Sequence, residues 1–426
     1  MLFRAIAFGS VVSASLLGGT AVWWKASGPA GSIADGGAAI AHGVSQPRDP
    51  VVVPSPIIQR PTPKPAPVIP ALPLRRLAAM PDLENLGIDD RLFGKSGDRR
   101  SLVSALNQSL RYIQSPQAQK QYRNYAVPGF TRRRVERSLR RFRQLVLRAR
   151  SAAQLRASVQ QEFQFYESVG KDGQGLVGFT GYYVPVQRAS RRKTAKYRYP
   201  LYKLPRGFAQ WKTPHPSRLQ LEGKDGLQGV RSQLKGRELV YLADRLQAFL
   251  IHVQGSSRLQ LTDGTTMSVG FAGATKHPYA SIGKELIKDG KFTLDELTLP
   301  KVLDYFEQRP QDLDIYLPRN KRFVFFRNTK GSPPLGSLGY PVTGDRSIAT
   351  DKSKLPPGAL ALIHTQLPNR QLEPTPISRF VLDQDTGSAI KGAGRVDVFL
   401  GTGDVAGKRA GLVNAPGKLY YLLLKQ

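Results

Sequence analysis

Hydrophobic side chains recur at helical spacing over residues 99–115 and 130–168, and both segments are predicted to be helices. In the second segment Val135, Leu139 and Phe142 belong to an apolar stripe, while arginines occupy the remaining faces. This arrangement predicts an amphipathic helix with one packed face and a basic outer face. Further helices are expected over 279–289, 294–308 and 310–316.

A different pattern begins at Gly178, where short apolar runs are separated by Gly, Pro and Asp-Gly turns. Asp263-Gly264 lies between two such runs, residues 258–261 and 266–271, and predicts a β-hairpin. Residues 320–426 are mostly strand-like, and no internal repeat is found. The two patterns together predict an α+β protein that is mainly β with helices.

The first 76 residues differ from both patterns. Residues 1–26 contain a charge-free run, Ala5–Trp24, that predicts a signal peptide or a signal anchor. Residues 27–76 form a Pro-rich segment with ten prolines between Pro47 and Pro73, and they are expected to be a disordered, extended tether. We therefore expect an exported protein of the periplasm or cell envelope, with membrane association through residues 5–24 left open.

The formal net charge of the chain is +32. Such a charge suits nucleic acid, an anionic membrane surface or an acidic polymer. Export argues against the first of these, so no nucleic-acid partner is expected. The remaining partners are anionic materials of the envelope.

Two residue types restrict the chemistry. The chain contains no cysteine, which excludes disulfides, zinc–thiolate sites and thiol nucleophiles. Its five histidines are scattered, and none forms the H-x-x-x-H pair of a metal-dependent hydrolase. No metal and no cofactor are therefore expected.

The candidate chemistry lies near the C-terminus. Asp397 is placed between Val396 and Val398 in an alternating run, so it shares one strand face with Arg395 and Phe399. Burial of a carboxyl group raises its pKa, and a carboxyl that stays protonated near neutral pH is a general acid. A structural aspartate that pairs with Arg395 or caps a turn is the alternative from this window alone.

Five stretches of the chain carry a resemblance when taken in order. They are Gly178–Tyr183, Ala248–Arg258, Gly270–Gly273 with His277–Gly283, Pro334–Gly339 with Arg346–Asp351, and Asp385–Gly403 with Ala406–Gly411. With these motifs, the chain from Leu77 to Gln426 resembles the membrane-bound lytic murein transglycosylase A family. Its last part looks like the family's three-aspartate domain, a double-psi β-barrel. Many relatives are lipoproteins anchored through cysteine, and without cysteine no lipid anchor is expected here.

The resemblance implies a discontinuous fold. Residues 77–190 and 320–426 are expected to form the double-psi β-barrel catalytic domain. Residues 191–319 are expected to be an inserted, smaller β-rich domain, with the substrate groove between the two. Peptidoglycan glycan strands are the implied substrate, and protein partners in cell-wall synthesis or hydrolysis are left open.

The resemblance also assigns the site. By position, Asp397 matches the family's catalytic acid/base, and Asp385 matches a second aspartate that tunes it. The expected substrate-binding residues are Thr180, Tyr182, Gln254, Ser256, Arg258, Asp351 and Lys391. The implied enzyme is a peptidoglycan lytic exotransglycosylase, a lyase that forms 1,6-anhydromuramoyl products with a single aspartate, although the residues leave endo and exo action open.

Two alternatives remain at this point. A glycoside hydrolase would use two carboxyl groups, with Asp385 or Asp351 activating water. A non-catalytic wall-binding scaffold would keep the fold without turnover. Analysis of the product ends separates the first alternative, and a turnover assay separates the second.

Overall fold

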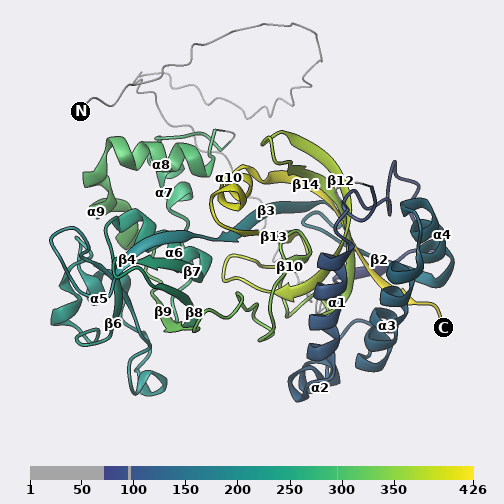
Figure 1. Ribbon diagram of the computed structural model, residues 1–426, viewed down its shortest axis with the longest axis horizontal. Coiled ribbons are helices and arrows are strands. Elements are labelled where there is room, and N and C mark those ends of the chain that lie inside the picture. Colours follow the sequence, from purple (N-terminus) through teal and green to yellow (C-terminus); the bar gives the residue numbers. More distant parts are fainter. Residues whose placement is uncertain (1–71, 95–96, 295) are drawn as a thin grey trace, which may run out of the picture. The chain divides into compact units, whose positions relative to one another are not determined.

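A computed structural model describes residues 72–426 apart from 95, 96 and 295 (Figure 1). The predicted signal segment and nearly all of the predicted tether lie outside these residues. The tether was expected to reach residue 76, but Leu74–Arg76 form strand β1, in which Leu74 pairs with Ser168. Among the described residues, no helix combines the length and apolar character needed to cross a membrane.

The larger sheet contains a closed barrel. Its strands are β3 (Val177–Val184), β10 (Ser347–Ala349), β11 (Leu360–Pro368), β12 (Pro374–Asp385), β13 (Arg395–Thr402) and β14 (Asn414–Leu424). They follow one another in the order β14-β11-β12-β10-β13-β3, and β3 pairs back with β14 to close the ring. β10 is parallel to β12, and β13 is parallel to β3. β2 (Phe163–Ser168) pairs with the C-terminal part of β14, from Tyr420 to Leu424, and β1 pairs with β2, so the two strands extend this sheet.

All strands of the second sheet lie between β3 and β10 in sequence, and an isolated parallel bridge between Lys203 and Phe326 links its two ends. Its order is β5 (Tyr199–Tyr202), β6 (Glu238–Leu242), β4 (Val186–Ser190), β7 (Ser256–Leu261), β8 (Thr266–Ala274) and β9 (Val324–Asn328). The predicted hairpin is confirmed, because β7 and β8 pair across Asp263-Gly264. The α+β class with a barrel and a second β-rich part is confirmed as well.

The passage between the sheets differs from the expected boundaries. β3 ends at Val184 in the barrel, and β4 begins at Val186 in the second sheet. β9 pairs with β8, so the segment Val324–Asn328 also belongs to the second sheet. Both β4 and β9 had been expected in the barrel, because a strand pattern alone does not reveal its pairing partner.

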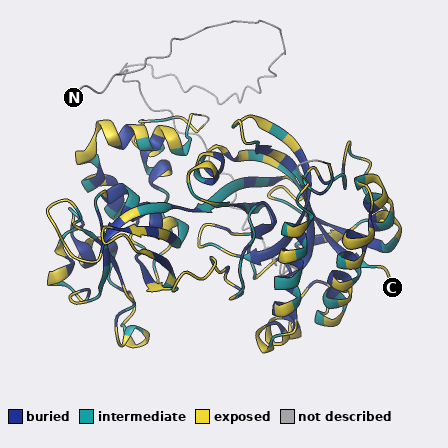
Figure 2. Ribbon diagram, in the orientation of Figure 1, coloured by how far each residue is buried: buried dark blue, intermediate teal, exposed yellow. Residues whose placement is uncertain are grey.

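Helices cover the sheets. They are α1 (Arg99–Ile113), α2 (Pro116–Arg123), α3 (Arg132–Arg148), α4 (Ala152–Glu162), α5 (Arg218–Glu222), α6 (Arg245–Gln254), α7 (Ile282–Lys288), α8 (Leu299–Gln308), α9 (Leu313–Tyr316) and α10 (Asp404–Leu412). Short 3-10 turns are Phe208–Gln210, Gln228–Arg231, Pro310–Asp312 and Leu317–Arg319. Figure 2 shows buried residues on the barrel strands and exposed residues on the outer faces of α1 and α3.

The predicted helix over 130–168 is wrong in its last part. α3 ends at Arg148, α4 occupies Ala152–Glu162, and Phe163–Ser168 is strand β2. All six residues of β2 are buried, as expected for a strand covered on both faces. Burial of this aromatic segment between β1 and β14 outweighs the helical spacing that continues from α4.

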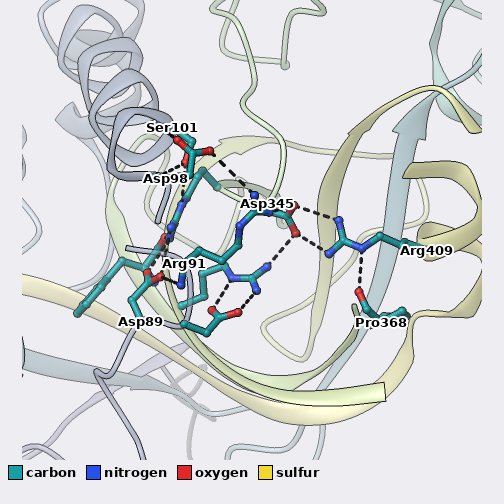
Figure 3. A network of polar contacts seen from close by, with 11 residues as sticks. Asp89, Arg91, Asp98, Ser101, Asp345, Pro368 and Arg409 are labelled. Atoms are coloured by element: carbon teal, nitrogen blue, oxygen red, sulfur yellow. Dashed lines mark hydrogen bonds and ion pairs between the residues drawn. The ribbon is translucent and has the colours of Figure 1, made fainter. Parts of the chain in front are cut away.

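A network of buried ion pairs ties the barrel to the segment before α1 (Figure 3). Arg346 is fully buried and donates to Asp89 at 2.6 Å. Arg379 and Arg409 both donate to Asp345, at 2.8 and 2.9 Å. Arg409 lies on α10 and Arg379 on β12, so these pairs join α10 to the strands that carry the candidate site.

Candidate active site

Asp385 and Asp397 lie on either side of the same residue of β10. Ala349 is paired with Asp385 of β12 and with Asp397 of β13. Adjacent strands are about 4.8 Å apart, so the two aspartate backbones are separated by roughly 10 Å. Eleven residues of chain lie between them in sequence, and the closed barrel brings them to one place.

The alternation predicted around Asp397 is confirmed. Val396 and Val398 are fully buried in the barrel core, whereas Asp397 is only partly covered and faces the other way. Asp397 is paired with Thr180 of the parallel strand β3, and the Thr180 hydroxyl donates to Asp397 Oδ1 at 2.9 Å. The structure therefore brings these two predicted site residues together.

Burial dominates the electrostatics of Asp397. It raises the pKa of this carboxyl to about 6, against the opposing effects of the Thr180 hydrogen bond and the Arg395 charge. The charge of Asp385 raises this pKa further. Arg395 shapes the site by its charge, and no hydrogen bond joins it to Asp397 among the described residues. At pH 7 a carboxyl with a pKa of about 6 is protonated in roughly one molecule in ten, far more often than a carboxyl with its ordinary pKa.

Asp385 accepts more hydrogen bonds than Asp397 does. The Tyr182 hydroxyl donates to its Oδ2 at 2.8 Å, and the backbone N–H groups of Ser337 and Thr386 donate to its Oδ1 at 2.8 Å each. Burial raises the pKa of Asp385, and these three donors act in the opposite direction. Tyr182 also packs its ring against Phe399, with ring centroids 5.1 Å apart.

Glycine at position 181 permits the close packing behind these residues. A Cβ atom at Gly181 would lie 2.9 Å from the Ala410 Cα of α10, which is too close for any larger residue. The helix therefore lies directly against β3. This contact fixes the strand that presents Thr180 and Tyr182 to the two aspartates.

A groove of about 870 Å³ runs beside this site. Tyr182, Asp385 and Phe399 line its barrel side, and β7, β8 and β9 supply the opposite side. Asp397 and Thr180 are not among the lining residues. Because Asp397 is two residues from Phe399 on the same strand face, its backbone lies about 7 Å from that lining residue.

Three predicted substrate-binding residues lie at the end of α6 and on β7. Ser256 and Arg258 both line the groove. Gln254 also lines it, but its side-chain oxygen accepts a hydrogen bond from the backbone N–H of Tyr183 at 3.2 Å. Gln254 thus links the end of α6 to β3.

Asp351 and Lys391 have different surroundings. Lys391 is exposed and lines the groove. Asp351 does not line it. Asp351 accepts hydrogen bonds from Ser353 and from the backbone N–H of Gly392, which together outweigh its burial and lower its pKa. Asp351 therefore holds the turn next to Lys391.

Tyr279 is a neighbour of the site that the sequence analysis did not select. Burial raises the pKa of its phenol, and among the smaller effects the charge of Asp397 raises it and that of Arg395 lowers it. Tyr279 therefore lies in electrostatic range of Asp397. The only available signal was its place in the motif His277–Gly283, because nothing in its local pattern distinguishes it from a packed tyrosine.

The prediction that no metal is bound stays a prediction. Among residues 72–426 as described, no cluster of three or more histidine, aspartate or glutamate side chains is arranged to hold a metal ion. The two aspartates of the site are instead surrounded by hydroxyl and backbone N–H donors. Such donors stabilise the ionised form of each carboxyl.

Comparison with known proteins agrees with this geometry. Residues 178–327 match the model of the MltA specific insert domain, and residues 346–423 match that of the 3D domain. A membrane-bound lytic murein transglycosylase A of Escherichia coli K12 is 30% identical over 261 residues, which cover 60% of this chain and 68% of the relative.

Solved structures show the same fold. A membrane-bound lytic murein transglycosylase from Agrobacterium tumefaciens matches with a TM-score of 0.65 at 23% identity, over 82% of this chain and 97% of that one. The structure of E. coli MltA with bound chitohexaose matches with a TM-score of 0.63 at 24% identity, over 83% and 95% of the two chains. With these likenesses and the two matched domain models, the chain belongs to the membrane-bound lytic murein transglycosylase A family.

Proposed function

We propose that this protein is a peptidoglycan lytic transglycosylase that uses Asp397 as its single acid/base. The observation that carries the proposal is the environment of Asp397. It is a partly buried carboxyl with one hydroxyl donor and a pKa raised to about 6, two residues along β13 from Phe399, which lines the groove. A group of this kind can both give and take a proton near neutral pH.

The reaction follows from one carboxyl group. Protonated Asp397 gives its proton to the oxygen that links N-acetylmuramic acid to N-acetylglucosamine. The C6 hydroxyl of the same muramic acid then attacks C1, and the Asp397 carboxylate accepts the proton of that hydroxyl. The products are a 1,6-anhydromuramoyl end and a free N-acetylglucosamine end, with no water consumed. Proximity within one sugar ring replaces an activated water.

Asp385, Tyr182 and Thr180 support this chemistry by position and charge. The charge of Asp385 raises the pKa of Asp397, and the Thr180 hydroxyl lowers it. Three donors hold Asp385 in place. We assign to Asp385 the tuning of Asp397, and to Thr180 the orientation of its carboxyl.

Glycan binding in the groove is supported by a relative. E. coli MltA, whose fold this chain shares, has been solved with bound chitohexaose. In this chain Tyr182, Ser256 and Arg258 line the groove, and Lys391 lines it from a barrel loop. We propose that a glycan strand occupies the groove with the bond to be cleaved at the Asp397 end.

A two-carboxyl hydrolase is the second reading, and the geometry favours it less. A base that activates water needs a free lone pair directed at that water. Three of the acceptor sites on Asp385 already receive donors. Asp351 lies outside the groove and caps a turn. A non-catalytic scaffold would not require the raised pKa of Asp397.

The location and domain organisation are also proposals. The family name indicates an envelope protein, and we propose that the chain acts in the periplasm or cell envelope. We also propose that the barrel is the catalytic domain and that the second sheet, with α5 to α9, is the inserted substrate-groove domain. The chain crosses between these parts near Pro185 and after Asn328.

Product analysis tests the proposed function. Purified protein is incubated with peptidoglycan sacculi, and the soluble products are examined by mass spectrometry. We expect anhydro ends, which are lighter than hydrolytic ends by one water. Reducing muramic acid ends would support the hydrolase, and an absence of released products would support the scaffold.

A further inference from the structure

The groove is strongly basic, and the proposed reaction does not use that charge. Of the described residues that line it, four are cationic (Arg258, Arg322, Arg327 and Lys391), and the only acidic one is Asp385. Peptide-free chitin-type glycan is uncharged. A basic groove therefore has no electrostatic advantage for the sugar backbone alone.

Arg258 and Arg327 lie on one wall of the groove, on strands separated by β8. Ser257 and Leu259 of β7 are buried, so alternation directs Ser256 and Arg258 to the groove side. On β9, Phe326 packs in the sheet core, and the next residue, Arg327, is exposed. We call Arg258 and Arg327 the basic wall.

Small residues form the floor between the two arginines. Gly270 of β8 is paired with Ser256 on one side and with Arg327 on the other. Ser268, paired with Arg258, also lines the groove. From the strand spacing and rise, the Cα atoms of Arg258 and Arg327 are about 12 Å apart. Both guanidinium groups can therefore reach over an open floor.

Neither arginine of the basic wall is neutralised by a neighbour. In the part of the chain that the structure describes, no ion pair joins Arg258, Arg327 or Lys391 to a carboxylate. Lys391 does influence Asp351 by its charge. Arg322 is different, because its guanidinium donates to the backbone oxygens of Thr275 and His277 at 3.2 and 3.4 Å.

We propose that Arg258 and Arg327, faced by Lys391, bind the carboxylates of the peptides that a peptidoglycan strand carries. This inference rests on the proposed function and adds a substrate preference to it. Guanidinium groups bind carboxylates through paired N–H donors. The enzyme then prefers anionic, peptide-bearing strands to neutral ones. The reason is that the arginines line the groove in which the sugars bind, so the peptide carboxylates come within their reach.

The test compares two forms of one substrate. Soluble peptide-bearing glycan strands are used as prepared or with their carboxylates capped as methylamides. The preference is the ratio of kcat/KM for the native strands to that for the capped strands. We expect the wild type to prefer native strands about tenfold or more, since each tenfold corresponds to the modest binding energy of one charge-assisted contact. Added salt should reduce this preference.

Variants assign the preference to the basic wall. In the double variant Arg258→Gln/Arg327→Gln the ratio should fall close to one, and in Arg258→Gln/Arg327→Glu it should fall below one. The matched control is Arg133→Gln/Arg137→Gln, which removes the same charge from the exposed face of α3 and should keep the wild-type ratio.

The outcomes separate the two proposals. The proposed role of the basic wall would be contradicted by a wild-type ratio near one at low salt. It would also be contradicted if the double variant kept the wild-type ratio. An equal fall of the ratio in the α3 control would also contradict the proposal, because the preference would then depend on the total charge of the protein and not on Arg258 and Arg327. An absence of anhydro products from both substrates with the wild type would instead overturn the proposed function.

Discussion

Asp345 and Asp397 belong to the same barrel and have opposite electrostatic environments. Burial raises the pKa of Asp345, but hydrogen bonds from Arg409 and the charges of Arg379 and Arg91 outweigh it and lower that pKa to about 2. Asp397 is partly buried, Thr180 is its hydrogen-bond donor, and its pKa rises to about 6. The two carboxyls share burial and differ in their cationic partners.

The difference between Asp345 and Asp397 shows how one fold can use aspartate both as a structural charge and as a proton donor. At Asp345 the loss of water is compensated by arginines that lock α10 and β12 together (Figure 3). At Asp397 that compensation is incomplete, so the protonated form is favoured. The first arrangement gives a permanent structural charge, and the second gives a transferable proton.

The largest expected effect is on turnover. Asp397→Asn keeps the size of the side chain and its hydrogen bond from Thr180, but it removes the transferable proton. We expect the release of anhydro products to fall about 10²–10⁴-fold or more, while glycan binding persists. Asp82→Asn, at an exposed position outside the groove, is the control and should leave turnover unchanged. Near-normal turnover of Asp397→Asn together with an inactive Asp385→Asn would reverse the assigned roles.

The next effect concerns Asp345. Asp345→Asn leaves the buried Arg409 without a carboxylate, while Arg379 keeps Asp90, and we expect a loss of about 3–5 kcal/mol in the free energy of unfolding. Because the folded pKa of about 2 lies below the ordinary value of 3.8, this stabilisation is present above pH 4 and is lost as pH falls toward 2. Urea denaturation across this range measures it. Asp263→Asn breaks an exposed pair with Arg191 and should change the stability far less than Asp345→Asn does.

Asp397→Asn should have the opposite effect on stability. The folded pKa of Asp397, about 6, lies above the ordinary value of 3.8, so ionisation destabilises the folded state as pH rises from 4 to 6. The Asn variant lacks this loss of stability, and we expect it to be up to about 3 kcal/mol more stable than the wild type at pH 7, as the difference between the two pKa values implies. The two proteins should converge near pH 4. Lower stability of the variant at pH 7 would mean that Asp397 is a structural carboxylate.

The smallest effect is expected at Thr180. Its hydrogen bond lowers the pKa of Asp397, so Thr180→Val should raise that pKa. The limb of kcat/KM that falls with rising pH should move upward by about half a pH unit. Thr180→Ser keeps a hydroxyl and should keep the wild-type profile. An unchanged profile in the valine variant would indicate that the proton donor is another group.

Several local features could be predicted from the sequence. The alternation of Val396, Asp397 and Val398 predicted a strand with the carboxyl opposite the core, and this is confirmed. The hairpin at Asp263-Gly264 and the helix beginning at residue 99 are confirmed as well. These features depend on contacts between residues that are close in sequence, and such contacts leave a periodic pattern.

Predictions failed where distant pairing decided the outcome. Phe163–Ser168 became a strand because β1 and β14 lie beside it, and Leu74–Arg76 left the expected tether for the same reason. β4 and β9 joined the second sheet, although their local patterns would suit either sheet. A strand pattern specifies which face is apolar, and it does not specify the partner.

The sequence by itself determined the residue types of the site, the faces of their strands and the family to which they point. Only the tertiary structure decided the environment of each carboxyl. Thr180 and Asp397 are 217 residues apart, and Tyr182 and Asp385 are 203 residues apart, yet each pair is joined by a hydrogen bond. The pKa of a carboxyl depends on burial and on neighbours that the closed barrel brings from remote segments. That is why Asp345 stays ionised above about pH 4, whereas Asp397 can exchange a proton near neutral pH.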